Sequence, residues 1–282
     1  MGAKKSQRGS LSRRTALRHI LLTSTTVSAS AGLIVRGKMF AAELPTGPAA
    51  DVKLLVFDVF GTVVDWRSSV IAEGEQLGKA KGLSADWAAF TDTWRAAYAP
   101  SMDKVRKGDL PWTKLDDLHR MSLDELLHRF KIEGLTEEEK DHFNRVWHRL
   151  KPWPDSVEGL ARLRKRHLIA PLSNGNLALL TDMAKHVGLP WDCILSAELV
   201  RHYKPDAEVY RSAYEFFNLK PGEVMMVAAH PGDLLVPKKL GMKTAYVHRP
   251  KEHRGPEPKL PPTGTFDFVV KDFLELASRL GL

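Results

Sequence analysis

The sequence predicts an α/β fold, namely a doubly wound parallel sheet with a block of helices inserted after its first strand. Three observations lead to this prediction. The apolar run at 54–57 is followed by Asp58 and a glycine turn, which is typical of a buried parallel strand. Residues 70–150 show helical periodicity with almost no strand pattern. From residue 167 onward, short apolar segments alternate with helical ones, as they do where helices join parallel strands.

The first part of the chain has the pattern of an export signal. Residues 12–18 read Ser-Arg-Arg-Thr-Ala-Leu-Arg, a twin-arginine pattern, and a mildly apolar segment follows at 20–35. That segment is short and rich in Ser and Thr compared with a membrane span of about 20 apolar residues, so we expect no stable membrane insertion. We expect residues 1–47 to be a leader and linker that direct the protein to the periplasm. Ala16 stands where such signals usually carry Phe, and the alternative is a basic tail on a cytoplasmic protein.

The helical block begins soon after the first strand, and Pro111-Trp112 and Gly134 interrupt it. Its expected helices are 70–81, 85–99, 114–130 and 136–150. We therefore expect a core domain of residues 48–66 and 151–282 and a helical cap domain of residues 67–150. Because the cap arises beside the end of a strand, we expect it to lie over the ligand crevice, exclude water and contact the substrate.

The remaining elements alternate between strand and helix. The expected strands are 167–172, 193–195, 224–228, 244–247 and 266–270, and the expected helices are 177–187, 207–217, 234–240 and 273–280. A Pro-rich loop is expected at 250–262. Cys193 is the only cysteine, so no intramolecular disulfide can form, and we expect it in a buried strand as a small hydrophobic side chain.

The charge of the chain is unevenly distributed. The 282 residues are enough for a sizeable core, and the net charge of +8 suggests an anionic partner. Eight of the 42 Lys and Arg residues, however, precede the first acidic residue, Glu43, so the remaining chain carries 34 basic and 34 acidic residues. This balance argues against nucleic acid as a partner.

Polar residues follow several of the expected strands, at the edge where an open parallel sheet binds its ligands. They are Asp58 and Thr62, then Ser173-Asn174-Gly175, then Lys204-Pro205-Asp206, then His230-Pro231-Gly232-Asp233. Each set alone has a structural explanation, such as a turn or cap at Asp58, a helix cap at Ser173 or Asp233, or a solvated Lys204. Their joint occurrence in this order indicates a site in which Asp58 is the candidate nucleophile.

At these residues the chain resembles the haloacid dehalogenase superfamily, over about residues 51–280. The superfamily pattern of Asp-x-x-x-Thr, a Ser or Thr, a Lys and a later acid is matched by Asp58, Thr62, Ser173, Lys204 and Asp233. A narrower resemblance, to the type II L-2-haloacid dehalogenases, is carried by Phe60, Trp94-Arg95, Asn174-Gly175, Pro205 through Tyr210 and Ala228-Ala229-His230. The resemblance implies a Rossmannoid core with a helical cap, a small 2-haloacid substrate, no metal or other cofactor, and a homodimer as in many members.

The residue at position 60 bears on the type of reaction. Phosphatases of similar sequence need a second carboxylate two residues after the nucleophile, to protonate the leaving oxygen, and a magnesium ion for the phosphoryl charge. Here that position is Phe60. A halide leaves without a proton, so carbon–halogen displacement does not need the missing acid. A magnesium-dependent phosphatase remains the alternative function, and a non-catalytic binding protein is a third.

The resemblance also implies roles for individual residues. Asp58 would displace the halide from carbon 2 with inversion, and water would then hydrolyse the ester at the Asp58 carbonyl carbon to give a 2-hydroxy acid. The other implied roles are an ionising cation for Asp58 (Lys204), water activation (Asp233), positioning of Asp58 and Lys204 (Thr62, Tyr210), halide binding (Arg95, Asn174), substrate carboxylate binding (Ser173) and pocket walls (Phe60, Trp112).

Two positions leave alternatives open. Arg95 lies on an expected amphipathic helix, where it could instead pair with Asp92 three residues earlier. His230 stands where the best-known dehalogenases have Asn, and it could replace that contact, make a pH-sensitive contact or simply pack. The choice at His230 affects the expected substrate range and pH optimum more than the type of reaction.

Overall fold

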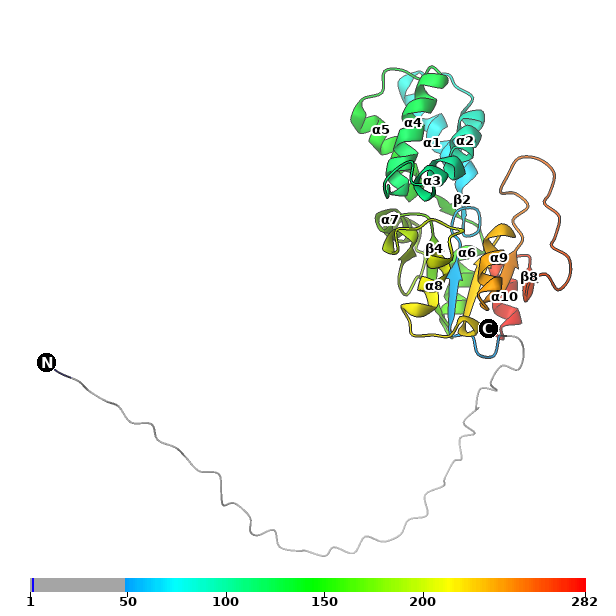
Figure 1. Cartoon of the computed structure of the whole chain (residues 1–282). Coiled ribbons are helices and arrows are strands. Elements are labelled where there is room, and N and C mark those ends of the chain that lie inside the picture. The colour runs from blue at the N-terminus through cyan, green and yellow to red at the C-terminus, as the bar shows by residue number, and fades with distance from the viewer. Residues whose placement is uncertain (1, 3–48) are drawn as a thin grey trace, which may run out of the picture. The chain divides into compact units, whose positions relative to one another are not determined.

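The computed structural model describes Gly2 and residues 49–282 (Figure 1). Apart from Gly2, the leader and linker predicted for residues 1–47 lie outside these described residues, and export stays a prediction. Residues 49–282 belong to one compact unit, and the proposed boundaries between a core and a cap domain also stay a prediction. Among the described residues, no helix combines the length and apolar character needed to span a bilayer.

The centre of the molecule is a sheet of six parallel strands in the order β5-β4-β1-β6-β7-β8. The strands are β1 (Leu54–Phe57), β4 (Leu168–Ser173), β5 (Leu195–Ser196), β6 (Val224–Ala228), β7 (Lys243–Val247) and β8 (Phe268–Val270). All four side chains of β1 are buried, as expected for a central strand that is covered on both faces. The prediction of a doubly wound parallel sheet is confirmed.

The order of the strands explains where a ligand site can form. From β1 the chain adds β4 and β5 on one side, then crosses to β6 and adds β7 and β8 on the other side. The connections from β1 and β6 therefore run in opposite directions and leave a crevice beyond the carboxyl ends of these two strands. Residues that directly follow β1 and β6 face this crevice.

Five helices flank the sheet, and further helices gather beyond one of its ends. The flanking helices are α6 (Ser156–Arg164), α7 (Leu177–Val187), α8 (Ala207–Glu215), α9 (Gly232–Lys239) and α10 (Phe273–Arg279). The inserted block contains α1 (Trp66–Lys81), α2 (Trp87–Ala96), α3 (Tyr98–Arg106), α4 (Leu115–Arg129), α5 (Glu137–Asn144) and the 3₁₀ turn η1 (Arg145–His148). In Figure 1 this block lies beyond the end of the sheet toward which β1 points, so it covers the crevice.

The structure differs from the sequence-based prediction at several elements. The helix expected at 85–99 is divided into α2 and α3, and the region expected as one helix at 136–150 contains α5 and η1. The sequence analysis missed α6 and the two-residue antiparallel strands β2 (Val64–Asp65) and β3 (Lys151–Pro152), through which the chain enters and leaves the helical block. Two-residue strands are too short to show a periodic pattern. The placement of Cys193 in a buried strand is wrong, because Cys193 is half-buried in a bend before β5.

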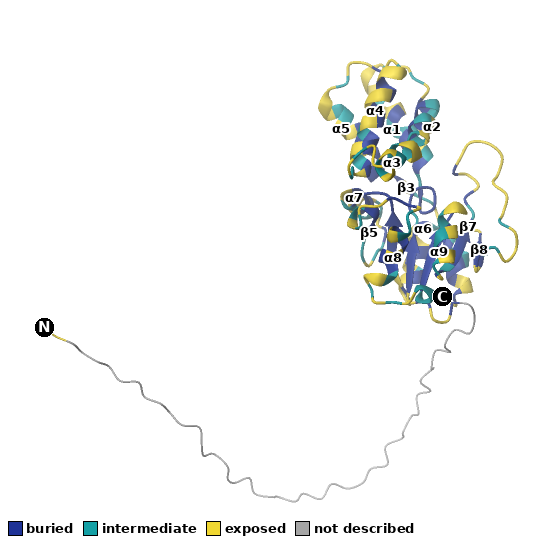
Figure 2. Ribbon diagram, viewed as in Figure 1, coloured by how far each residue is buried: buried dark blue, intermediate teal, exposed yellow. Residues whose placement is uncertain are grey.

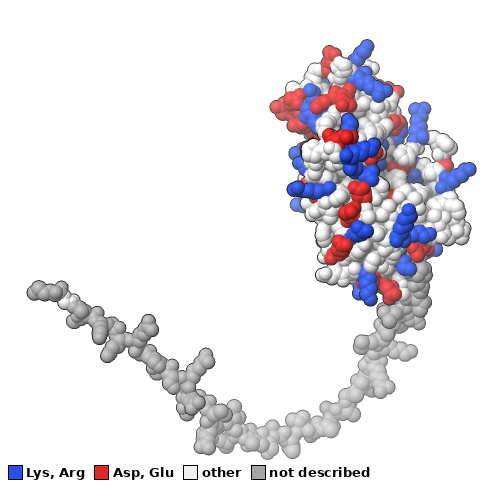
Figure 3. Space-filling model, in the orientation of Figure 1, with Lys and Arg blue, Asp and Glu red and all other residues white. Residues whose placement is uncertain are grey.

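Figure 2 shows that the strands form the most deeply buried part of the molecule, while the outer faces of the helices are exposed. On the face shown in Figure 3, acidic and basic side chains are interspersed, and no single sign of charge dominates. This mixture agrees with the balanced charge of the chain after Glu43.

A buried histidine joins the helical block to the flanking helix α7. His148, in η1, contacts Asp116 of α4 at 3.0 Å and Asp182 of α7 at 2.9 Å. The Nδ2 group of Asn176 donates to the second oxygen of Asp116 at 2.9 Å. Burial alone would lower the pKa of His148, but Asp116 and Asp182 outweigh it and raise the pKa above the ordinary value.

This contact predicts a pH-dependent contribution to stability. A raised histidine pKa stabilises the fold fully below the unfolded value of about 6.5, and the stabilisation is lost as the pH rises through the folded value. We expect His148→Gln to lower the free energy of unfolding by about 1 kcal/mol more at pH 6 than at pH 9.5. Denaturant unfolding at both pH values measures this, with His186→Gln on the exposed side of α7 as control. An equal loss at both pH values would contradict the prediction.

Candidate active site

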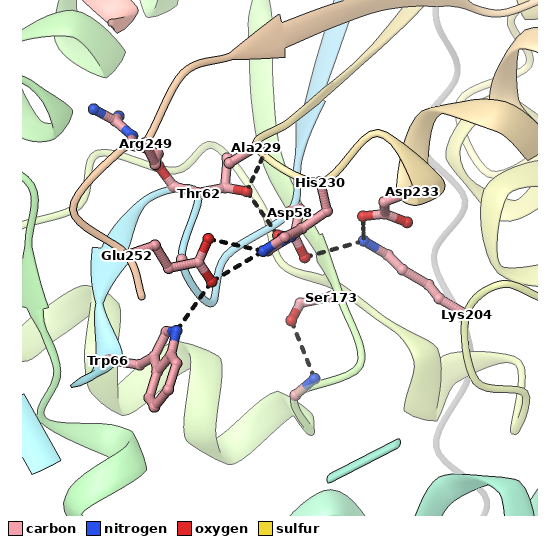
Figure 4. Close-up of polar contacts among 12 residues, drawn as sticks. Asp58, Thr62, Trp66, Ser173, Lys204, Ala229, His230, Asp233, Arg249 and Glu252 are labelled. Carbon is pink, nitrogen blue, oxygen red and sulfur yellow. Dashed lines mark hydrogen bonds and ion pairs between the residues drawn. The ribbon is translucent and has the colours of Figure 1, made fainter. Parts of the chain in front are cut away.

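Asp58 directly follows β1 and is held in place from two sides. Its backbone N–H donates to Val227 of β6 at 3.0 Å, and the Thr62 hydroxyl donates to its Oδ2 at 2.7 Å (Figure 4). Thr62 is fully buried, and its Oγ1 also accepts from the backbone N–H of Ala229 at 2.9 Å. Thr62 thus ties the carboxylate of Asp58 to the end of β6.

Lys204 lies between two carboxylates. Its Nζ is 3.4 Å from Oδ1 of Asp58 and 2.7 Å from Oδ2 of Asp233, and its side chain is only 7% exposed. The other oxygen of Asp233 accepts from the Tyr210 hydroxyl. The backbone N–H of Lys204 donates to Oδ1 of Asn174 at 2.8 Å, which leaves the Asn174 amide nitrogen as a donor. Residues that follow β1 and β6 therefore meet at the Lys204 ammonium group, and Asn174, which follows β4, holds the Lys204 backbone.

His230 links Asp58 to an acid that the sequence analysis did not consider. Its Nδ1 lies 3.3 Å from Oδ2 of Asp58, and its Nε2 lies 2.9 Å from both carboxylate oxygens of Glu252. The indole N–H of Trp66 donates to Oε1 of Glu252 at 3.0 Å. Of the three roles considered for His230, the structure favours a pH-sensitive contact, because the imidazole lies between two carboxylates.

Glu252 was missed because it belongs to the segment 250–262, where an acid in a Pro-rich loop suggests solvent exposure. Instead its side chain is 5% exposed and lies directly against Gly61. A Cβ atom at Gly61 would be 2.0 Å from Oε1 of Glu252, and the φ of Gly61 is +86°, which favours glycine. The only sequence signal for this contact was Gly61 itself, because a glycine at this turn lets another segment of the chain approach closely.

The charges around Asp58 determine its protonation state. Burial would raise the pKa of Asp58, but Lys204, His230 and Thr62 outweigh it and hold the pKa well below its ordinary value. Burial lowers the pKa of His230, yet the contacts with Asp58 and Glu252 raise it to about 10. Burial raises the pKa of Asp233, and Asp58 adds to the effect although Lys204 opposes it. Asp58 is therefore the ionised carboxylate, and Asp233 is the more basic of the two.

A cavity of about 330 Å³ opens onto these groups. It is lined by Asp58, Phe60, Arg95, Tyr98, Ala99, Met102, Asn174, Lys204, Pro205, Tyr210, His230, Gly232 and Asp233. The structure thus brings most of the predicted site residues to one cavity between the helical block and the sheet. The sequence analysis did not predict Tyr98 and Met102 as site residues. Both belong to α3; Tyr98 lies at the end of the helix expected at 85–99, and Met102 lies just beyond it.

Arg95 presents an unpaired cation to this cavity. Its guanidinium lies over the ring of Tyr98 at 4.3 Å and over the ring of Trp66 at 5.3 Å. Its Nη1 is buried and has no hydrogen-bond partner among the described residues. The alternative that Arg95 pairs with Asp92 is wrong, because Asp92 instead forms two hydrogen bonds with Arg67, of 2.7 and 2.8 Å. A buried donor without a partner is costly, so this group is suited to an anionic ligand.

Two predicted binding residues do not reach the cavity. Ser173 is fully buried, and its Oγ accepts from the backbone N–H of Gly175 at 3.1 Å. The prediction that Trp112 forms a wall is wrong, because its ring packs on Tyr203 with a centroid distance of 4.8 Å. Trp112 thereby supports Tyr203, the residue just before Lys204. Binding of the substrate carboxylate by Ser173 stays a prediction.

Comparison with known proteins agrees with this arrangement. The family model of the haloacid dehalogenase-like hydrolases matches residues 52–241, more than half of the chain. The chain belongs to this family. It is similar to two solved structures of L-2-haloacid dehalogenases. One is the defluorinating enzyme Rha0230, with 43% identity, a TM-score of 0.78 and coverage of 82% of this chain and 96% of that one. The other is PA0810, with 44% identity, a TM-score of 0.78 and coverage of 82% and 99%.

A curated relative of this haloacid dehalogenase-like hydrolase is (S)-2-haloacid dehalogenase 4A of Burkholderia cepacia. The two chains are 29% identical over 208 residues, which cover 70% of this chain and 84% of the relative.

Proposed function

We propose that this haloacid dehalogenase-like hydrolase converts small (S)-2-haloacids to (R)-2-hydroxy acids through an ester on Asp58. The observation that carries the proposal is a cavity of about 330 Å³ that joins an ionised Asp58 to the unpaired guanidinium of Arg95. A nucleophile and an anion-binding cation at one small cavity are the two groups that halide displacement requires. The names of the similar proteins support the same reaction.

In the first step, Asp58 attacks carbon 2 of the substrate. Oδ2 of Asp58 is held by Thr62 and His230, whereas Oδ1 has only the longer contact with Lys204, so Oδ1 is the freer nucleophile. The new carbon–oxygen bond forms as the carbon–halogen bond breaks, and the halide leaves as an anion that needs no proton. Arg95 and Asn174 line the same cavity, and in this proposal the guanidinium and the amide bind that anion.

In the second step, water attacks the carbonyl carbon of the ester on Asp58. Asp233 lines the same cavity, and its raised pKa suits it to accept a proton from that water. Cleavage of the ester returns the carboxylate of Asp58 and releases the 2-hydroxy acid. Over both steps, one water molecule is consumed and one proton and one halide ion are released.

The phosphatase alternative lacks its general acid. Phe60 occupies that position and packs edge-on against Tyr98 and Trp147, with centroid distances of 6.3 and 5.9 Å. The apolar contacts of Phe60 shape the cavity wall and provide no proton for a leaving oxygen. The charged arrangement of Asp58, Lys204 and Asp233 in turn argues against a non-catalytic binding protein, because such a protein does not need an ionised buried nucleophile.

Halide release from the two enantiomers of 2-chloropropionate tests the proposal. With the purified protein and excess chelator, we expect chloride release from the L form and not from the D form. No release from either enantiomer, together with hydrolysis of a phosphate ester on addition of magnesium, would contradict the proposal and favour the phosphatase. Sedimentation velocity on the same sample tests the proposed homodimer.

We also propose that the leader directs twin-arginine export to the periplasm. The support is the pattern Arg13-Arg14 followed by a mildly apolar segment. Cell fractionation of the full chain should place it in the periplasm, and the double variant Arg13→Lys, Arg14→Lys should stay in the cytoplasm. Equal distribution of both proteins would contradict export by this route.

A further inference from the structure

Three metal-ligating side chains converge beside Asp58, namely His230, Glu252 and His253. One ligand atom from each lies within 4.8 Å of the other two. His230 Nε2 is 2.9 Å from Glu252 Oε2, and His253 Nε2 is 3.4 Å from Glu252 Oε1. We propose that this cluster binds a transition-metal cation such as Zn²⁺, and that the bound cation inhibits the neighbouring catalytic site.

The spacing of the donor atoms suits a small cation. Zinc bonds of about 2.0–2.2 Å in a tetrahedral site separate the ligand atoms by roughly 3.3 Å. The two printed contacts with Glu252, of 2.9 and 3.4 Å, lie close to that separation. Two imidazole nitrogens and one carboxylate are typical of Zn²⁺, Co²⁺ or Ni²⁺, whereas Mg²⁺ prefers oxygen ligands.

Contacts around the cluster hold its ligands in place. The Trp66 indole N–H donates to Glu252 at 3.0 Å, and the ring of His253 packs edge-on against the Trp66 ring at 5.7 Å. Glu252 is held over Gly61 and is almost fully buried, while the side chains of His230 and His253 are 34% and 62% exposed. A fixed carboxylate with two imidazoles on its solvent side gives a cation a direct path to the site.

Asp58 would accept a hydrogen bond from the histidine that binds the metal. When Nδ1–H of His230 donates to Asp58, its Nε2 can bind a cation after release of the Nε2 proton. This is the carboxylate–histidine–metal arrangement that orients ligands in many metal sites. The cation would replace the contact between His230 and Glu252, and its positive charge would make the Asp58 carboxylate a weaker nucleophile.

Calorimetric titration of the tag-free full chain with Zn²⁺ tests the site without reference to activity. We expect one equivalent of Zn²⁺ to bind, and Mg²⁺ not to bind at the same concentration. His253→Ala removes an exposed ligand that has no part in the proposed reaction, and we expect it to weaken Zn²⁺ binding by at least about tenfold. His202→Ala, an exposed histidine that contacts Asp206 at 3.2 Å, is the matched control and should bind Zn²⁺ like the native chain.

The inhibitory effect rests on the proposed function and is measured separately. One equivalent of Zn²⁺ should suppress halide release by the native chain, chelator should restore it, and His253→Ala should resist the inhibition. Absence of Zn²⁺ binding, or equal binding by the native chain and His253→Ala, would overturn the site. Binding without loss of halide release would overturn the inhibition. If the protein released no halide at all, the calorimetric result would still decide whether the metal site exists.

Discussion

Replacement of Asp58 by Asn is expected to reduce halide release from L-2-chloropropionate by more than about 10⁴-fold. Asn keeps the shape of the side chain but lacks the anionic oxygen that forms the bond to carbon 2. The rate of chloride release under saturating substrate measures the effect. Asp51→Asn, at an exposed carboxylate before β1, is the control and should retain the native rate.

The same prediction can be tested through the intermediate. If water attacks the ester carbonyl, a single turnover in H₂¹⁸O should place the label in Asp58 and leave the first hydroxy acid unlabelled. Label in the product of the first turnover would mean that water attacks carbon 2 directly, and Asp58 would then not be the nucleophile. Native thermal stability of Asp58→Asn would show that lost activity does not reflect unfolding, since Lys204 and His230 lose an anionic partner in this variant.

Replacement of Arg95 by Lys is expected to lower kcat by about 10²–10³-fold. The flat guanidinium of Arg95 lies on the Tyr98 ring, while its Nη1 has no hydrogen-bond partner within residues 49–282. A compact ammonium cannot keep both the stacking and the position of the donor. Steady-state rates of halide release over a range of substrate concentrations separate effects on kcat from effects on KM.

Arg67→Lys provides the matched control for this substitution. Arg67 makes a bidentate contact with Asp92 on the outside of the helical block, away from the cavity, and we expect nearly native rates. Unchanged turnover in Arg95→Lys would remove Arg95 from the mechanism, and the anion-binding role would then pass to other groups of the cavity.

Local sequence patterns predicted the sheet and the order of the site residues. β6 and α7 have the predicted bounds, because a compact apolar run and an amphipathic helix that ends at Gly188 carry strong local signals. The residues after β1, β4 and β6 could be assigned to one edge, since parallel strands end together. Short elements such as β2 and β3 carried no such signal. The sequence analysis extended one helix to residue 99, although Pro100 lies in the first turn of α3 and signals a nearby break in the helix.

The fold class and the identity of the candidate nucleophile were determined by the sequence itself, because apolar periodicity and the position of Asp58 after a buried strand are local properties. Only the tertiary structure decided which partners the charged groups have. It placed Asp92 on Arg67, left Arg95 Nη1 without a hydrogen-bond partner in the described part of the chain, and brought Glu252 from a distant loop to His230. Contacts between residues far apart in the chain depend on how the loops and the helical block pack, and no local pattern specifies that packing.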